Sequence, residues 1–142
     1  MISTKGRYAL RILVDLAEHN NGSYIPMKFV AERQDLSLKY IERILPILKQ
    51  NNIVEGLHGK GGGYRLTRPP EEYTVWEILN IMEGSLAPVA CVEKERNNCP
   101  RASSCSTVEM WEGYYRLTKE YFSGITIADL MNRDSNSGEY II

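Results

Sequence analysis

Residues 35–67 constrain the fold of this chain more than any other stretch, because a helical pattern is followed directly by a glycine-rich hairpin pattern. Ser37 is a favourable N-cap, since its hydroxyl can accept a hydrogen bond from a free backbone N–H of the first helical turn. We expect the helix to end near residues 50–52, where Asn can adopt a left-handed turn, and Pro46 to bend it without breaking it. Apolar residues at helical spacing predict its buried face, which comprises Ile41, Ile44, Leu45 and Leu48.

The residues after this helix predict a β-hairpin with a basic tip. Residues 53–57 and 63–67 indicate two short strands, and the loop His58–Gly63 contains four glycines in six residues together with Lys60. Such a loop lets the backbone approach another surface closely. It does not match the P-loop pattern, which also requires a following helix. A plain hairpin turn is the alternative, but the helix pair that precedes the hairpin favours a winged helix-turn-helix.

Two further helices are predicted before this stretch. Residues 4–18 carry a broad apolar stripe, and basic residues crowd the start of this helix, where the dipole prefers anions. That misfit indicates either an external anion such as DNA phosphate or a solvated basic face. Pro26 suits the first turn of a second helix, Met27–Arg33, and we expect its inward residues to be Phe29, Val30 and Ala31. Residues 26–51 are therefore predicted to form a helix-turn-helix with the second helix in the recognition position.

Charge is divided unequally along the 142 residues, although the formal net charge is only −1. Residues 1–68 hold 11 Lys and Arg against 6 Asp and Glu, whereas residues 69–142 hold 6 against 12. This asymmetry predicts that the first half meets a polyanion and that the second half has another task. The apolar runs are too short to span a bilayer and Met1–Lys5 is not a signal peptide, so we expect a cytoplasmic protein without membrane contact.

The second half is predicted to hold three helices around an irregular segment, residues 85–104. Thr74 and Glu77 form a capping-box pattern at the start of the first of these helices, and Gly84 suits its end. Residues 107–122 predict a long helix with more aromatic and apolar residues than one face can bury, which indicates that it lies between its own domain and a partner. A last short helix is predicted at residues 125–131, with a cap formed by Thr126 and Asp129.

The three cysteines, Cys91, Cys99 and Cys105, all lie in or beside the irregular segment. An odd count without a secretory signal argues against a disulfide framework. Their gaps of seven and five residues suit an iron–sulfur cluster with a fourth, different ligand better than zinc. Redox-active thiols are the main alternative, followed by zinc and by no role. Cys105 precedes the long helix, whose N-terminal dipole favours a thiolate.

Beyond these patterns, the chain resembles over nearly its whole length the bacterial winged-helix regulators of the Rrf family, which includes IscR, NsrR and CymR. The matching stretches are residues 3–9, 31–34, 37–42, 59–66, the cysteine segment and residues 125–130. The resemblance implies a homodimer joined through the long helix, with two winged helices reading a pseudo-palindromic operator in double-stranded DNA. It also implies a 2Fe–2S cluster held by the loop cysteines, as in the IscR and NsrR branches.

The sequence departs from the IscR pattern at positions that bear on function. IscR-like members complete the cluster with a His three residues after the third Cys, where this chain has Val108. The fourth ligand is then Glu109, an acid of the loop, a group from the other subunit or an external thiol. His58 stands where relatives tend to carry Arg, and Arg43 where IscR-like members carry Gln, so the operator sequence does not carry over.

The resulting prediction is a mainly α fold with a small β-hairpin wing. A winged helix-turn-helix DNA-binding domain covers residues 1–84, a cysteine-bearing loop 85–106, a dimerisation helix and closing short helix 107–133, and a tail 134–142. Base readers are expected on the second helix of the helix-turn-helix. Phosphate contacts are expected at the starts of the helices at residues 4–18 and 27–33 and on the wing. The full expected DNA-binding set is Thr4, Lys5, Lys28, Ser37, Lys39, Tyr40, Glu42, Arg43, His58, Lys60 and Gly61.

The predicted function is a homodimeric DNA-binding transcriptional regulator that senses cluster, iron, redox or nitrosative status through a 2Fe–2S cluster. The alternative is a CymR-like repressor of cysteine and sulfur metabolism without a cluster, controlled by a regulatory protein partner or by thiol oxidation. A small electron carrier would leave the helix-turn-helix unexplained. No nucleophile–base pair, paired carboxylates or nucleotide fingerprint indicates an enzyme.

Overall fold

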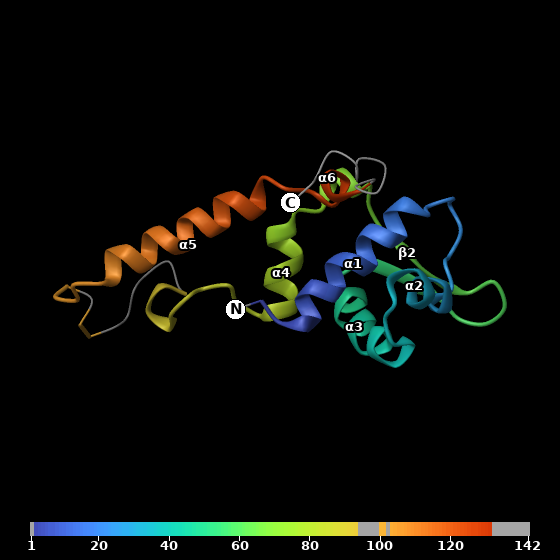
Figure 1. The fold of residues 1–142 in the computed structure, drawn as a ribbon, viewed down its shortest axis with the longest axis horizontal. Coiled ribbons are helices and arrows are strands. Elements are labelled where there is room, and N and C mark those ends of the chain that lie inside the picture. Colours follow the sequence, from blue (N-terminus) through green and yellow to red (C-terminus); the bar gives the residue numbers. More distant parts are fainter. Residues whose placement is uncertain (1, 94–99, 102, 132–142) are drawn as a thin grey trace.

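A winged helix-turn-helix body and a protruding helical arm make up residues 2–93, 100–101 and 103–131, the part that the computed structural model describes (Figure 1). The arm is α5, which extends away from the other helices and the hairpin. This arrangement confirms the predicted fold, mainly helical with a two-stranded antiparallel hairpin. Within these residues no helix has both the length and the apolar character needed to cross a membrane. The elements in chain order are α1 Thr4–Glu18, α2 Met27–Gln34, α3 Leu38–Gln50, β1 Val54–Leu57, β2 Gly63–Leu66, η1 Pro70–Glu72, α4 Val75–Glu83, η2 Ala90–Val92, α5 Val108–Ser123 and α6 Ile127–Leu130.

α1 forms the centre of the body and packs against α2, α4, α6 and β2. Ser3 caps its N-terminus, because the Ser3 hydroxyl accepts a hydrogen bond from the Gly6 N–H at 3.2 Å. The predicted apolar stripe is buried except at Leu10, which is partly buried, and the predicted bounds of the helix match the observed ones. Its most deeply buried apolar residues are Ala9, Ile12, Leu13 and Leu16.

α2 and α3 meet in a tight turn at Asp35, whose backbone adopts the left-handed conformation with a φ of 52°. Asp tolerates this conformation better than most residues. α3 then begins after Ser37, whose hydroxyl accepts from the Tyr40 N–H, and the helix runs through Pro46 to its C-cap at Asn51. Its predicted inward face is buried in full, and the helix therefore presents a fixed outer face to its surroundings.

The sequence pattern was wrong at one core position of α2. Phe29 is predicted to face inward, but its side chain is 42% exposed. Met27 and Val30 already supply the buried side of this eight-residue helix, and Phe29 lies about 100° around the helix axis from Val30. The Lys28 ammonium stands 5.1 Å from the centre of the Phe29 ring, so the exposed ring packs against a basic side chain.

A buried carboxylate fixes α2 against α1. Asp15 of α1 is only 1% exposed. It accepts hydrogen bonds from Arg33 Nη2 at 2.7 Å and from Gln34 Nε2 at 3.0 Å. A carboxylate buried this deeply requires such partners, and its hydrogen bond holds the pKa of Arg33 above the usual value. The first helix of the helix-turn-helix is therefore held in a defined position on α1.

The hairpin is tied to the residue that precedes the helix-turn-helix. β1 and β2 pair antiparallel, with Val54 opposite Leu66 and Leu57 opposite Gly63. The Ile25 N–H donates to the Tyr64 carbonyl at 2.8 Å, and the Tyr64 N–H donates to the Ile25 carbonyl at 2.9 Å. This approach requires Gly63, whose φ is 147° and at which a Cβ atom would clash with the Ile25 carbonyl.

After the arm the chain returns to the body through α6. Thr74, just before α4, and Thr126, just before α6, form an isolated antiparallel bridge. Thr126 and Asp129 cap α6 reciprocally, as the sequence predicts. Ile127 is fully buried in the same core as α1, so the chain after the C-terminal end of the arm is anchored on the winged helix-turn-helix.

The predicted capping box of α4 is only half formed. Thr74 accepts a hydrogen bond from the Glu77 N–H, as expected. The Glu77 carboxylate instead binds the Arg68 guanidinium, with a closest N–O distance of 2.7 Å. A charged donor within reach is a stronger partner for this carboxylate than a single backbone N–H, and the sequence pattern does not reveal such a donor.

Candidate nucleic-acid interface

The outer face of α3 carries the predicted base-reading residues. Lys39, Glu42 and Arg43 are exposed there, and Ser37 caps the N-terminal end of the helix. None of these three charged side chains has an ion-pair partner within the described part of the chain. Their charged groups are therefore free to meet base edges, where Arg suits guanine and Glu can accept from cytosine.

Tyr40 differs from its neighbours on α3, because it is half-buried. Its ring meets the ring of Tyr8 edge-on, with 5.4 Å between the centroids. The guanidinium of Arg11 lies 5.4 Å from the centre of the Tyr8 ring on the same surface of α1. Tyr40 thus helps to seat α3 on α1.

A groove of about 350 Å³ separates α3 from the hairpin. α2 contributes Lys28 to its lining, α3 contributes Glu42 and Lys49, and the hairpin side contributes Leu57 and His58. Of the elements predicted to bind DNA, α2, α3 and the hairpin therefore border one concave surface, whereas the start of α1 does not line it. A groove between a recognition helix and a wing suits the sugar–phosphate strand beside the major groove that the helix enters.

Glycine backbone shapes the tip of the hairpin. Gly59 and Gly61 have φ values of 89° and 78°, and the Gly62 N–H donates to the Gly59 carbonyl at 3.0 Å. The tip exposes His58, Lys60 and Gly61, so the three predicted wing residues all face outward.

The basic residues of the first half fall into two groups that a charge count does not separate. Arg33, Arg65 and Arg68 are paired within the fold, with N–O distances of 2.7, 2.6 and 2.7 Å to acidic side chains. A second group is exposed and forms no ion pair among the described residues. These unpaired cations are available to phosphates. They are Lys5, Arg7, Arg11, Lys28, Lys39, Arg43, Lys49 and Lys60, of which Arg7 and Arg11 donate hydrogen bonds to Thr4 and Gln34.

The start of α1 places Thr4 and Lys5 in its first turn, and the Lys5 side chain is exposed. The first turn itself contains no acidic residue. Glu83, the last residue of α4, supplies an anion at this end, since its Oε1 accepts a hydrogen bond from the Ser3 N–H at 2.9 Å. The Glu83 carboxylate therefore supplies part of the negative charge that the N-terminal end of the α1 dipole favours.

Sequence reasoning missed three residues that line the groove: Leu38, Lys49 and Leu57. Leu38 is 40% exposed and Leu57 is 48% exposed. Apolar side chains in such places can contact the methyl group of thymine. An apolar residue directly after the N-cap and outside the inward helical pattern is the signal that would have indicated Leu38.

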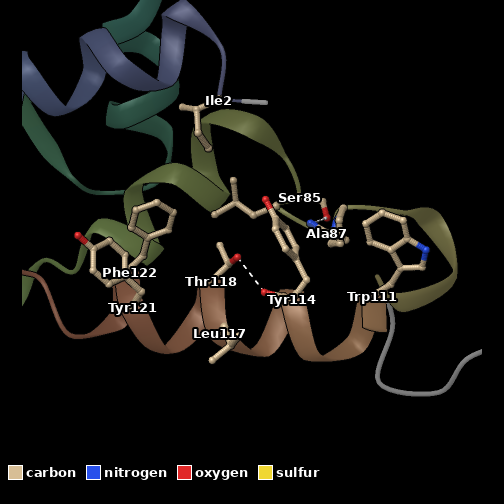
Figure 2. A pocket seen from close by; sticks show the side chains of 11 residues that line it. Ile2, Ser85, Ala87, Trp111, Tyr114, Leu117, Thr118, Tyr121 and Phe122 are labelled. Carbon is tan, nitrogen blue, oxygen red and sulfur yellow. Dashed lines mark hydrogen bonds between the residues drawn. The ribbon is translucent and has the colours of Figure 1, made fainter. Parts of the chain in front are cut away.

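α5 presents a second surface, apolar and uncovered in the described chain. Its most exposed large side chains are Met110, Tyr114, Leu117 and Tyr121, with exposed fractions of 56, 56, 66 and 67%. Their spacing of four, three and four residues is that of a coiled-coil seam. Figure 2 shows side chains of α5 lining a groove of about 750 Å³ together with Ile2 and the segment that follows α4.

The cysteine segment is described in part. Cys91 lies half-buried in η2, and Cys105 is exposed just before α5, whereas Cys99 lies outside the described residues. Cys105 Sγ lies 3.4 Å from the Thr107 hydroxyl. Hydrogen bonds from the Thr107 side chain and from the backbone of Thr107 and Val108 lower the pKa of Cys105. The lowered pKa agrees with the thiolate predicted at the start of the long helix. The hydrogen bond from the Thr107 hydroxyl is the largest cause of this shift.

The described residues contain no complete metal-binding site. Within residues 2–93, 100–101 and 103–131, no three His, Cys, Asp or Glu side chains gather in a group that could hold a metal ion. Of the three thiols, the described residues include Cys91 and Cys105.

Comparisons with known proteins agree with this geometry. The profile of the Rrf2 family, described as iron-dependent transcriptional regulator, matches residues 2–133. The HTH-type transcriptional regulator IscR of Serratia proteamaculans is 30% identical over 131 residues, which cover 92% of this chain and 79% of that protein. Two solved structures are also similar. CymR, the global cysteine regulator of B. subtilis, matches with a TM-score of 0.74 at 30% identity, over 92% of this chain and 95% of that one. IscR of T. potens matches with a TM-score of 0.75 at 30% identity, over 100% and 93%.

Proposed function

Because this chain belongs to the Rrf2 family of transcriptional regulators, we propose that it acts as a homodimer that binds a pseudo-palindromic operator through α3 and the hairpin. The family and the relatives are transcriptional regulators, so the chain is not an enzyme, as its sequence predicts. Its site of action would be the cytoplasm, where bacterial DNA lies. The observation that carries this proposal is that exposed basic side chains without ion-pair partners lie on α3 and beside the α3–hairpin groove.

In the proposed complex α3 lies in the major groove. Lys39, Glu42 and Arg43 face base edges, because they project from its outer face with no partner in the described chain. Lys28 lines the α3–hairpin groove and Lys60 is exposed at the tip of the hairpin, where they would hold phosphates and fix the register. Thr4 and Lys5 would add a phosphate contact at the start of α1. The exposed Gly61 amide and the His58 ring complete the contact surface on the wing.

The DNA-binding proposal is tested by selecting duplexes from a random-sequence pool with the purified chain. We expect two related half-sites whose centres lie roughly 10–10.5 base pairs apart, or a multiple of that, as two-fold related recognition helices require. A pool that shows no enrichment in any metal or redox state of the protein contradicts the proposal.

The dimer is proposed to form through the seam on α5. Four large apolar side chains that are more than half exposed would be unusual on a lone surface helix, and their heptad spacing suits a second copy of the same helix. Leu117→Lys should therefore shift the chain to monomer in sedimentation equilibrium. Lys119→Glu on a neighbouring exposed position is the control and should leave the dimer intact. A Leu117→Lys chain that stays dimeric would refute this assignment.

For sensing, we propose that Cys91, Cys99 and Cys105 hold a 2Fe–2S cluster. The lowered pKa of Cys105 supports this, because iron–sulfur clusters bind thiolates. The description of the matching family as iron-dependent supports it too. When bound, the cluster would supply a redox- and iron-responsive bond between the segment after α4 and the start of α5. Protein made without oxygen should be coloured and contain iron and sulfide, and Cys105→Ala should lose both.

A second candidate is a cluster-free regulator of cysteine metabolism, controlled by a partner protein or by thiol oxidation. One observation favours it: the chain is similar in structure to CymR, the global cysteine regulator of B. subtilis. Colourless protein from anaerobic preparations, with operator affinity that changes on oxidation of Cys105, would favour this candidate over the cluster.

A further inference from the structure

Glu83 makes a contact that the described function does not use. It is the last residue of α4, and its Oε1 accepts hydrogen bonds from both the Ser3 N–H, at 2.9 Å, and the Ser3 hydroxyl, at 2.7 Å. Ser3 is the N-cap of α1, and its hydroxyl oxygen in turn accepts from the Gly6 N–H at 3.2 Å. One oxygen of the Glu83 carboxylate therefore holds Ser3, the N-cap residue of α1.

Gly6 shows that the fold is built around this contact. Gly6 is buried in the first turn of α1, and a Cβ atom there would collide with the Glu83 carboxylate. Glycine weakens a helix interior, because it gains no side-chain packing and loses more backbone freedom on folding than other residues. The absence of a Cβ atom at Gly6 therefore lets the Glu83 carboxylate occupy its observed position beside Ser3.

Glu83 also stands where two parts of the molecule meet. On one side is the first turn of α1, which carries Thr4 and Lys5. On the other side Gly84, with a φ of 80°, ends α4, and the chain continues into the segment that holds Cys91 and packs through η2 against α5.

Two further contacts join the same parts. Ile2 and residues 85–88 line the groove beside α5 (Figure 2). Trp76 of α4 packs against Tyr115 of α5, with 5.7 Å between the ring centroids. A displacement of the segment after α4 therefore acts on the end of α4, next to Glu83, whereas a displacement of α5 acts through Trp76 on the first turn of the same helix.

We propose that Glu83 is a positioning residue that couples the cysteine segment and α5 to the DNA-facing start of α1. With the Ser3–Glu83 contact formed, the first turn of α1 is held so that Lys5 meets a phosphate. When the end of α4 moves, the contact breaks, the turn frays and the Lys5 contact is lost. This inference rests on the proposed function, because it needs a duplex at the start of α1.

The test compares variants of the full-length chain on one duplex that the chain itself selects from a random pool. Glu83→Ala removes the acceptor of both hydrogen bonds, and Ser3→Ala removes the hydroxyl donor together with the N-cap of α1 while it keeps the backbone N–H donor. Glu83→Gln keeps an Oε1 acceptor for both Ser3 donors. We expect the first two to weaken binding about 5- to 10-fold and to lower the slope of log K against log salt by roughly 0.9 per lost phosphate contact in each protomer. Glu83→Gln should bind within about twofold of wild type, since a neutral acceptor retains most of such a hydrogen bond.

Lys5→Ala provides the discriminating arm. If Glu83 acts by placing Lys5, then Lys5→Ala weakens binding of the wild-type chain but has almost no effect on the Glu83→Ala chain. A general loss of fold would not produce this non-additivity, and the thermal midpoint of each variant checks for such a loss. Hydrogen exchange at residues 3–7 without DNA should rise in Ser3→Ala and stay at the wild-type level in Glu83→Gln.

The outcomes separate this inference from the proposed function. If Lys5→Ala weakens binding while Ser3→Ala and Glu83→Ala keep wild-type affinity and salt slope, the coupling role is refuted and the DNA-binding function stands. Additive losses for Lys5→Ala and Glu83→Ala also refute it. If the wild-type chain prefers no duplex at all, both the proposed function and this role fall.

Discussion

Replacing Gly63 by alanine should cost far more stability than the same change at Gly61, although the two glycines lie two residues apart in one loop. Gly63 has a φ of 147°, and an added Cβ atom would come well inside the 3.0 Å that real Cβ atoms keep from the Ile25 carbonyl. Backbone atoms cannot rotate away as a flexible side chain can. The hairpin must therefore move off Ile25.

The size of the effect follows from what is lost. Alanine in a glycine-only conformation costs about 1–2 kcal/mol. Separation of Tyr64 from Ile25 removes two backbone hydrogen bonds, each with a net value of about 1 kcal/mol. We expect Gly63→Ala to lower the free energy of unfolding by about 3–4 kcal/mol, a large part of the roughly 5–15 kcal/mol of a typical domain. Gly61 has a φ of 78°, but the space around an added Cβ atom is open. We therefore expect Gly61→Ala to lower the free energy of unfolding by about 1 kcal/mol.

Urea unfolding at one fixed protein concentration measures both values, because the stability of a dimer depends on concentration. Gly61→Ala also controls for backbone stiffening, since it adds the same methyl group to the same loop. Equal losses at the two positions would show that the loop is a plain flexible turn, and the packing described for the base of the hairpin would be wrong.

Two further predictions concern charged groups elsewhere. Asp15→Ala should lower the free energy of unfolding by about 2–3 kcal/mol, which is at or below the low end for breaking a buried ion pair because the Arg33 side chain is 33% exposed. In the Asp15→Ala chain, the further change Arg33→Ala should cost little additional stability in urea unfolding. Losses that add in full for the two changes would contradict the pairing. In the metal-free reduced chain, the pKa of Cys105 lies below its usual value. The reactive thiolate is therefore more abundant at pH 7, and Thr107→Val should slow alkylation of Cys105 at pH 7 but not at pH 10; equal rates at pH 7 would exclude the Thr107 hydrogen bond as the cause.

The local elements of the fold were predictable because several sequence signals agree at each of them. At α3 the N-cap, the inward apolar period and the terminal asparagines all indicate the same helix, and the structure has it at Leu38–Gln50. The capping pair of α6 is likewise local and is observed as predicted at Thr126 and Asp129. Pairs three or four residues apart in a helix can be read from sequence alone.

What the sequence did not reveal depends on contacts between distant residues. Ser3 and Glu83 are 80 positions apart, and neither has a pattern that indicates the other. Glu77 matched a capping box, but Arg68 arrives from outside the helix and binds its carboxylate. Phe29 was placed inward because apolar residues usually are, yet a short helix needs only one buried side. The division of cations into paired and unpaired groups could be made only once the acidic partners were in place.

The most direct test of the account is the salt dependence of operator binding for lysines on and off the proposed interface. Lys28→Ala and Lys60→Ala should each lower the slope of log K against log salt by roughly 0.9 per phosphate contact, thus by about two per dimer. Lys119→Ala removes the same charge from exposed α5, away from α3 and the hairpin, and should leave the slope unchanged. Equal slopes for all three variants would contradict the claim that the unpaired cations around α3 and the hairpin hold the DNA.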